Sequence, residues 1–424
     1  MEKTVSERPE NAYPQEFFLK QVRRATPVGG GVAGHSGEDR NGCHPSSAEM
    51  SGRGISAARR SHTPAGKEGI YGIISLIRSM KCSAISGPVF EQHNREGHLE
   101  SHDRLVSIIR RLPENLPLIE PVRAACGEIE RVHDPGYLAW LRGQCLEHTG
   151  YDYVRDTVYS GGYLEQNTFV PGFIDPNTYI NPHSYDVATY AAGSAVAAME
   201  RALDGTSCFA LVRPPGHHAA AAWAMGFCLM NNAAIAAAKA LTMVDRVAII
   251  DWDVHHGNGT QDIFYGSDRV LYCSVHQSGL FPHTGAPGES GTGAGKGFSV
   301  NAPLLPGSGG ADYSCVFSEV FLPLLERTNP DLVIISAGQD TLWDDPVGGM
   351  NLVPGDFGHL TALLLDAIPQ PLALVLEGGY GPSHGEAVRH IFRALQGSPC
   401  RKESGDPSRQ TAELVSKLRG LHGL

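Results

Sequence analysis

Short apolar runs alternate with longer segments of helical character along most of the chain. Each run holds four or five consecutive apolar residues and is followed at once by polar residues or glycine; the runs lie at 209–212, 247–250, 270–273, 332–335 and 372–376. A similar segment, 81–85, follows Met80. Runs of this length are too short for helices and are typical of strands buried on both faces of a sheet.

Several of the segments between these runs have the periodicity of helices. Apolar residues recur at steps of three and four in 104–112 and 122–141, and alanine is frequent in 185–203 and 231–241. Strands that alternate with helices predict an α/β fold, in which a parallel sheet is covered by helices on both faces.

Residues 1–69 have a different pattern. They contain a glycine run at 29–31 and scattered Ser, Arg and Glu, with almost no apolar periodicity. Such a segment cannot bury enough apolar surface to fold by itself, so we expect a disordered extension. Ordered sequence is expected from about Ile70.

Composition and charge narrow the function classes. The 424 residues carry a formal charge of −11, which argues against direct nucleic-acid binding. No run of 18 apolar residues and no secretory signal are visible, so we expect no membrane span and no export. Nine cysteines without a C-x-x-C pair favour a reducing compartment, and hence the cytoplasm, over a disulfide framework.

The unusual polar residues gather directly after the predicted strands. Ligands of open parallel sheets bind at the carboxyl ends of the strands, so these residues are expected at one edge of the sheet. They are Arg213-Pro-Pro-Gly-His217-His218, Asp251-Trp-Asp253-Val-His255-His256-Gly-Asn258, Ser274-Val275-His276, Ser336-Ala-Gly-Gln-Asp340 and Glu377-Gly-Gly-Tyr380.

Asp251, Asp253 and His255 alternate, so in an extended chain they point to the same side. Buried neighbouring carboxylates need a cation or hydrogen-bond donors, and an imidazole beside them completes a ligand set for zinc or another divalent ion. Asp340, from another strand end, could supply a further ligand. Three protein ligands would leave room for water and substrate, as in catalytic sites. The alternative is a polar strand end that caps neighbouring helices.

Two further features suggest proton chemistry. His217 and His218 could bind metal or act as acid and base beside a metal-bound water, with Asp251 and Asn258 orienting their rings. Tyr380 could donate to a developing oxyanion, although Gly-Gly-Tyr is also common in ordinary turns.

Together these motifs resemble the zinc-dependent histone deacetylase family, in the class II-like branch with bacterial deacetylases and acetylpolyamine amidohydrolases. The resemblance is carried in order by Arg-Pro-Pro-Gly-His-His (213–218), Gly-Phe-Cys (226–228), Asp-Trp-Asp-Val-His-His-Gly-Asn-Gly (251–259), Ser-Ala-Gly-Gln-Asp (336–340) and Leu-Glu-Gly-Gly-Tyr (376–380). It implies a single-domain arginase/deacetylase fold with an eight-stranded parallel sheet. The domain would span 80–397, between an extension over 1–79 and a tail over 398–424 with a short helix.

The resemblance also implies a role for each residue of the motifs. Asp253, His255 and Asp340 would bind one catalytic Zn²⁺. The acid–base pair would be His217, supported by Asp251, and His218, supported by Asn258, with His218 as the proton shuttle. Tyr380 would hydrogen-bond the scissile carbonyl oxygen and then the oxyanion.

A substrate channel and a second ion are implied as well. Gly226, Phe227 and Phe281 would flank a narrow channel. A structural K⁺ would be held by Asp251, by Ser274 and Val275, and by the carbonyls of Asp253 and His255. The substrate would be an acylated lysine of a protein or peptide, or an acetylated small amine, and acetate would be released. An oligomer is compatible with the sequence.

Four positions depart from the family pattern. Asn177 replaces a rim aspartate and His183 replaces a glycine in the same stretch. Gln339 stands where many relatives have Phe, and Val347 lies where polyamine-selective relatives can have an acidic residue. Anchoring of a peptide backbone at the rim and polyamine recognition therefore have no support in the sequence.

Two alternative functions differ from an active amidohydrolase. A catalytically silent acyl-binding or scaffold protein would be favoured by loss of Tyr380 or of a zinc ligand, and all are present. A two-metal ureohydrolase would need more carboxylates around a second divalent ion, and none is apparent in the sequence.

We predict that a chain beginning at Met80 matches the full chain in melting temperature and activity, because residues 1–69 offer no periodic apolar face. Thermal unfolding and the deacetylase assay described below test this. A large loss of either property would show that the extension packs on the domain.

Overall fold

The computed structural model describes residues 81–147, 174–175, 177–400 and 405–424. The predicted extension over residues 1–79 lies outside this part of the chain. Within it, eight strands form one sheet, and every pairing between neighbours is parallel. The predicted α/β class, with an eight-stranded parallel sheet, is confirmed.

The strands follow the order β2-β1-β3-β8-β7-β4-β5-β6 across the sheet. Because neighbouring strands are parallel, the chain must cross back over the sheet between consecutive strands, and most of these crossovers contain helices. The bounds of the strands are β1 Cys82–Ile85, β2 Leu118–Ile119, β3 Ser207–Ala210, β4 Val247–Asp251, β5 Val270–Gln277, β6 Ser299–Leu304, β7 Leu332–Ala337 and β8 Leu372–Leu376.

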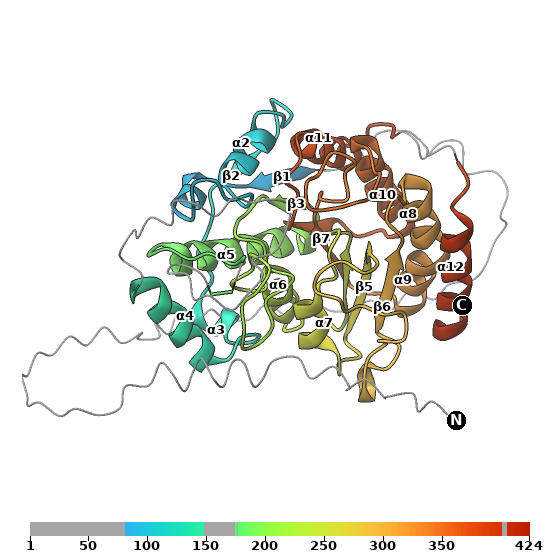
Figure 1. Ribbon diagram of the computed structural model, residues 1–424, viewed down its shortest axis with the longest axis horizontal. Coiled ribbons are helices and arrows are strands. Elements are labelled where there is room, and N and C mark those ends of the chain that lie inside the picture. Colours follow the sequence, from blue (N-terminus) through green and yellow to red (C-terminus); the bar gives the residue numbers. More distant parts are fainter. Residues whose placement is uncertain (1–80, 148–173, 176, 401–404) are drawn as a thin grey trace, which may run out of the picture. The chain divides into compact units, whose positions relative to one another are not determined.

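Helices of varied length connect the strands. They are η1 Pro88–Gln92, α2 Asp103–Ile109, α3 Cys126–Ile129, α4 Pro135–Glu147, α5 Ser184–Leu203, α6 Asn232–Ala240, α7 Asn258–Phe264, η2 Gly293–Gly295, α8 Gly310–Val316, η3 Phe317–Phe321, α9 Leu322–Thr328, α10 Pro354–Ala367, α11 His384–Leu395 and α12 Arg409–His422. Helices α5 and α6 pack on the central strands, while α2, α10 and α11 form a second group (Figure 1).

Three sequence expectations need correction. The single helix expected over 122–141 is two helices, because Pro135 cannot continue a helix and the carboxylate of Asp134 caps the next one at the N–H of Tyr137. Strand β3 begins and ends two residues earlier than the apolar run at 209–212. Strand β5 extends to Gln277, so Ser274, Val275 and His276 lie within it rather than after it.

Aromatic side chains fix the second group of helices against the sheet. Phe392 of α11 contacts Phe209 of β3, with ring centroids 5.8 Å apart, and Phe357 of α10 meets Trp252 at 6.2 Å. All four side chains are fully buried. Full burial of an apolar side chain of this size stabilises the fold by about 1.5–3 kcal/mol. These contacts hold α10 and α11 against the sheet, whose carboxyl edge carries the loops of the site.

A buried ion pair joins Glu100, near the start of the described residues, to Arg213 after β3. Both carboxylate oxygens of Glu100 accept from the guanidinium of Arg213, at 2.8 and 2.7 Å, and one also accepts from Arg104 at 3.1 Å. Burial by itself raises the pKa of Glu100, but the two arginines outweigh it and hold the pKa well below its ordinary value of 4.5. Glu100 is thus a buried carboxylate with two cationic partners.

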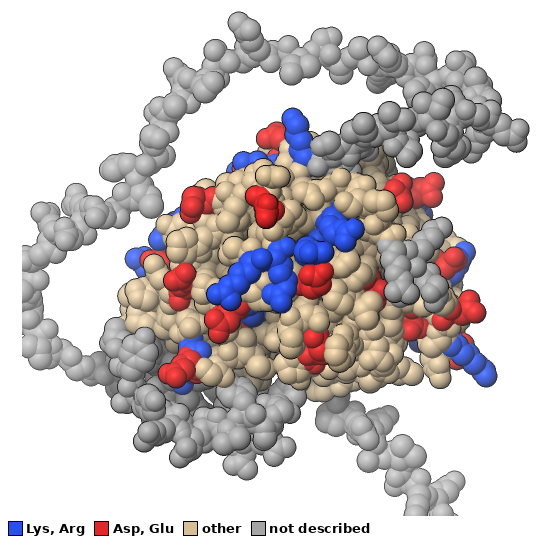
Figure 2. Space-filling model, turned by 90° about the horizontal axis from the view of Figure 1, so that it is seen from above, with Lys and Arg blue, Asp and Glu red and all other residues tan. Residues whose placement is uncertain are grey.

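The charged side chains are unevenly distributed over the surface. Basic side chains gather in a band on the face seen from above in Figure 2, among scattered acidic ones. Within the described residues, no helix combines the length and the apolar character that crossing a membrane requires.

We predict that Glu100→Gln destabilises the domain by about 3–5 kcal/mol at pH 7, because it leaves two buried arginines without their counter-charge. The depressed pKa of Glu100 means that its contribution to stability is complete above pH 4.5 and is lost as the pH falls below that value. Denaturant unfolding at pH 7 and below pH 4.5 should therefore show a weaker acid dependence in the variant. Glu386→Gln, at a partly exposed pair on α11, is the control and should change stability by about 0.5 kcal/mol or less. Equal stability of the two variants would refute the prediction.

Candidate active site

Three potential metal ligands meet at adjacent strand ends. Asp253 and His255 follow β4, and Asp340 follows β7, which is paired with β4. Their ligand atoms all lie within 4.8 Å of one another. The Nδ1 atom of His255 is 3.2 Å from Oδ1 of Asp253 and 3.4 Å from Oδ2 of Asp340. The three sequence-predicted ligands are thus brought together by the pairing of β4 with β7.

The surroundings of these three side chains fit a cation. Oδ2 of Asp340 is buried and has no hydrogen-bond partner, which is costly unless a cation accepts its lone pairs. Two glycines leave room around the carboxylates: a Cβ at Gly378 would lie 2.0 Å from Oδ2 of Asp340, and a Cβ at Gly338 would lie 2.1 Å from Oδ2 of Asp253. One imidazole and two carboxylates form a ligand set that zinc accepts.

The pKa values of the three potential ligands also favour a bound cation. Burial and the neighbouring Asp253 raise the pKa of Asp340 to about 7. Burial alone would lower the pKa of His255, but Asp253 and Asp340 outweigh it and raise the pKa to about 9. Ionisation of both carboxylates at this distance is unfavourable without a positive charge between them. A divalent ion would supply that charge.

His217 and His218 follow β3 and lie beside the cluster with opposite electrostatic surroundings. Nδ1 of His217 is 3.1 Å from Oδ2 of Asp251, and its Nε2 is 3.7 Å from Oδ1 of Asp253. Burial disfavours its charge, but these carboxylates prevail and raise its pKa well above the ordinary value. Burial and the cationic His217 lower the pKa of His218 well below the ordinary value. The surroundings therefore favour the charged form of His217 and the neutral form of His218.

The neutral ring has a defined tautomer. Nδ1 of His218 is 2.7 Å from Oδ1 of Asn258, and the amide nitrogen of Asn258 faces the sulfur of Met225 at 3.4 Å. The amide thus presents its oxygen, so Nδ1 of His218 carries the proton and donates to it. Nε2 of His218 is left with a free lone pair, as a general base requires.

A pocket of about 340 Å³ is lined by the two histidines and by the three potential metal ligands. Phe227 and Phe281 line it, and Gly226 lies where a Cβ would be 2.5 Å from the ring of His218 and 3.0 Å from that of Phe281. Gly226 also has φ of +57°, so glycine is needed here for both space and backbone conformation. The three predicted channel residues therefore line the same pocket as the histidines.

Tyr380 lies in the loop after β8 and lines the same pocket. Its ring contacts Phe227 edge-on at 5.7 Å, and the guanidinium of Arg104 lies 4.6 Å from its centroid. Burial raises the pKa of Tyr380 well above the ordinary value, so the phenol keeps its proton and remains a donor at neutral pH. Glycines lie on both sides of Tyr380 in the sequence, yet the contacts with Phe227 and Arg104 hold its ring in place.

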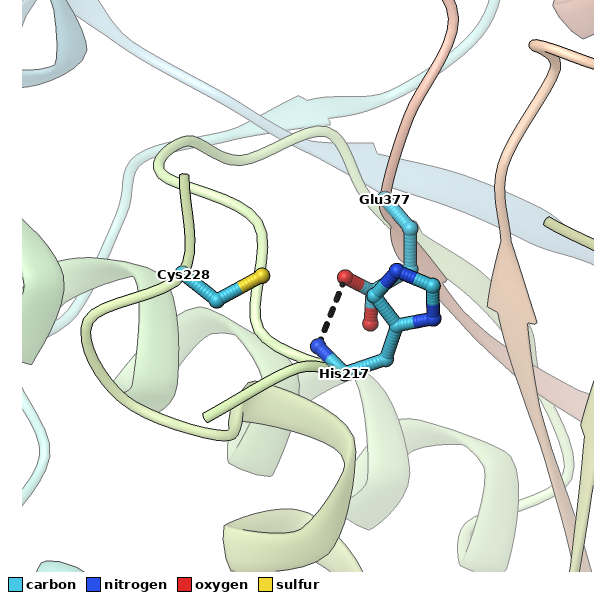
Figure 3. A group of neighbouring side chains, drawn as sticks. All are labelled: His217, Cys228 and Glu377. Atoms are coloured by element: carbon cyan, nitrogen blue, oxygen red, sulfur yellow. Dashed lines mark hydrogen bonds between the residues drawn. The ribbon is translucent and has the colours of Figure 1, made fainter. Parts of the chain in front are cut away.

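A second group of ligand-type atoms, from His217, Cys228 and Glu377, is less suited to a metal (Figure 3). One oxygen of Glu377 already accepts from the N–H groups of Gly216 and His217, at 2.7 and 3.1 Å, and the other accepts from Ser336. Burial raises the pKa of Cys228 well above the ordinary value, which disfavours the thiolate that binds metals. Glu377 instead links the histidine turn to the end of β8.

The residues predicted to hold potassium also lie at one place. Asp251 pairs with Ser274 across β4 and β5, next to Val275, and Asp253 and His255 follow directly. Asp251 already accepts from the N–H of Asp253 at 3.1 Å and from the hydroxyl of Tyr272 at 3.0 Å.

Sequence reasoning missed several residues that shape the site. Arg104 donates to the carbonyl of Gly379, and Asp345 accepts from the N–H groups of Tyr380 and Gly381. The Asp344-Asp345-Pro346 turn shortly after Asp340 was the available signal for the carboxylate. Of the departures from the family pattern, Asn177 and Val347 line the pocket, whereas Gln339 is buried against His384 at 2.9 Å.

Comparisons with known proteins agree with this geometry. The Histone deacetylase domain family matches residues 98–395. The histone deacetylase-like amidohydrolase of Pseudomonas aeruginosa is 39% identical over 337 residues, covering 75% of this chain and 81% of its own. A probable deacetylase of Archaeoglobus fulgidus is 37% identical over 297 residues, covering 67% and 76%. The crystal structure of the HDA15 HD domain superposes with a TM-score of 0.72 at 31% identity, covering 81% of this chain and 96% of that one.

This chain belongs to the histone deacetylase family. The resemblance inferred from its motifs is confirmed, as is the arginase/deacetylase fold that it implied. The Archaeoglobus relative is a probable deacetylase and the Pseudomonas relative is a histone deacetylase-like amidohydrolase, which supports a hydrolase that acts on an acetylated amine or peptide.

We predict that Asp340→Ala causes strong loss of a bound divalent metal, because the variant removes a carboxylate oxygen that is buried beside His255 without a hydrogen bond. Elemental analysis of the purified protein measures this directly. Cys228→Ala, in the second group, should keep full metal content. Full occupancy in Asp340→Ala would remove Asp340 from the site, and loss only in Cys228→Ala would assign the metal to the other group.

Proposed function

We propose that this member of the histone deacetylase family is a zinc-dependent amidohydrolase that removes acetyl or related acyl groups from lysine side chains or similar amines. The observation that carries the proposal is the convergence of Asp253, His255 and Asp340 with His217, His218 and Tyr380 in the lining of one pocket. Each of these groups matches a task in amide hydrolysis.

The lining of the pocket supports an acylated side chain with a run of methylene groups. It includes Leu99, Leu280, Phe227 and Phe281, whose apolar surfaces favour methylene groups. Among the described residues that line it, the carboxylates are those of Asp253 and Asp340, which belong to the candidate metal site. A polyamine carries charges along its length and would find no other acidic side chain among the described residues of the lining. An acyl-lysine is neutral as far as its backbone and fits better.

The chain's own residues can move the protons of the reaction. His218, neutral with Nε2 free, can take a proton from the attacking water as the new C–O bond forms. The same nitrogen can then give that proton to the amine nitrogen as the C–N bond breaks, releasing the amine and acetate. Asp251 accepts from Nδ1 of His217 and favours its charged form, so this ring can provide positive charge beside the reacting centre.

Tyr380 supplies a neutral hydrogen-bond donor for the carbonyl oxygen of the substrate. Its protonated phenol can hydrogen-bond the carbonyl oxygen and then, more strongly, the oxyanion of the tetrahedral intermediate. Asp253, His255 and Asp340 would hold the zinc ion, which would polarise the carbonyl and lower the pKa of a bound water. We further propose that the site around Asp251 and Ser274 holds a structural K⁺.

We predict that Tyr380→Phe lowers kcat by about 10²–10³, because it deletes one oxyanion donor that acts mainly in the transition state. Zinc content and melting temperature should remain those of the parent, since only a hydroxyl is lost. Tyr265→Phe, outside the pocket lining, is the matched control and should leave kcat unchanged. A Tyr380→Phe enzyme within a few-fold of the parent would show that the proposed mechanism is wrong.

A panel of acetyl-lysine peptides, acetylpolyamines and longer acyl-lysines, assayed with zinc-loaded protein, tests the proposal as a whole. We expect turnover of acyl-lysine peptides above that of acetylpolyamines. Failure of every acyl amide despite bound zinc would favour a silent acyl-binding protein of the same fold.

A further inference from the structure

The loop over residues 377–383 connects β8 to α11 and carries Tyr380 into the pocket. A phenol at the end of a side chain is only as well placed as the backbone that bears it. Oxyanion donors act through a preorganised position, and a misplacement of about 1 Å can cost on the order of 10² in rate. What holds this loop is therefore a question about catalysis.

A single buried carboxylate holds the backbone of Tyr380. Oδ2 of Asp345 accepts from the N–H of Tyr380 at 2.6 Å and from the N–H of Gly381 at 2.8 Å. Asp345 is 6% exposed, so water does not compete for these bonds. Hydrogen bonds to an ionised carboxylate are shorter and roughly twice as strong as those between neutral groups. The loop is thus fixed at the residue that carries the phenol.

The other oxygen of the same carboxylate faces the pocket wall. Oδ1 of Asp345 accepts from the N–H of Val347 at 3.0 Å, and Pro346 and Val347 both line the pocket. Asp345 therefore ties the tyrosine loop to a part of the wall. The segment from Asp340 to Asp345 is short, so the same stretch of chain carries a potential metal ligand at one end and this carboxylate at the other.

Arg104 holds the opposite side of the loop. Its Nε donates to the carbonyl of Gly379 at 2.7 Å, and its guanidinium lies over the ring of Tyr380. Carbonyls on one side are bound by a cation, and N–H groups on the other side by an anion. The peptide units around Tyr380 are thereby held from both directions.

We propose that Asp345 is a positioning residue for deacetylation, which sets the phenol of Tyr380 relative to the metal ligands and the pocket wall. This inference rests on the proposed function, because Asp345 acts only through Tyr380. Neither the motifs nor the metal cluster includes it.

The test is a double-mutant cycle measured on the full chain with an acetyl-lysine peptide. Asp345→Ala, which removes both accepting oxygens, should lower kcat by about 10², with KM changed by less than about threefold and zinc content kept. Asp345→Asn retains one oxygen without the charge and should lose about tenfold. In the Tyr380→Phe background, both substitutions should change kcat by less than about threefold, because the donor that they position is already gone.

The neighbouring Asp344 supplies a matched control. Its Oδ2 accepts from the N–H of Ser383 at 3.0 Å, in the same loop but beyond the tyrosine. Asp344→Asn should leave kcat within about threefold of the parent. A role in general loop stability would instead make the two aspartates equivalent.

The outcomes distinguish a positioning role of Asp345 from a purely structural one. Equal losses with and without the Tyr380 hydroxyl would overturn the inference and leave Asp345 a structural residue, and so would loss of zinc or of the fold in both Asp345 variants. Unchanged kcat in Tyr380→Phe alone would refute the proposed function itself. In that case the inference fails for a different and recognisable reason.

Discussion

The burial of several carboxylates at one edge of a parallel sheet is the constraint on which this structure depends. Asp251, Asp253, Asp340 and Glu377 are all at most 1% exposed. An ionised carboxylate in such a place is strongly disfavoured unless donors or cations surround it. The loops at the carboxyl ends of β3, β4, β7 and β8 therefore turn their N–H groups inward. Gly378 donates to Asp253, Val254 to Asp340, and Gly216 to Glu377.

The same carboxylates separate the properties of two adjacent histidines. His217 faces Asp251 and Asp253, which favour its protonation, whereas His218 faces the amide of Asn258 and the ring of His217. In the proposed amide hydrolysis the neutral ring would act as the base. If Asn258 were a carboxylate, it would favour the protonated form of His218 and weaken it as a base at neutral pH. The identity of the orienting residue thus sets the chemistry of the pair.

Rigid support of the pocket comes from pairs of opposite charge. Glu100 is held between Arg213 and Arg104, and Arg104 in turn binds the carbonyl groups at Glu377 and Gly379. The ion pair that stabilises the first part of the domain therefore extends to the loop that bears Tyr380. Stability of the fold and placement of the proposed oxyanion donor share these side chains.

The sequence by itself determined the strands and helices whose local pattern is unambiguous. It also determined which polar side chains follow the ends of these strands. Strands β4, β7 and β8 were predictable because a strand buried on both faces needs a continuous apolar run. Strand β6 was not predictable, since it includes Asn301 and Pro303. Tertiary structure alone decided that β7 lies beside β4, which brings Asp340 to Asp253 and His255. It also decided contacts such as Glu100 with Arg213, 113 residues apart, and Asp345 with Tyr380, 35 apart. No local pattern encodes such contacts, because they and the pKa values that follow from them depend on which side chains are buried together.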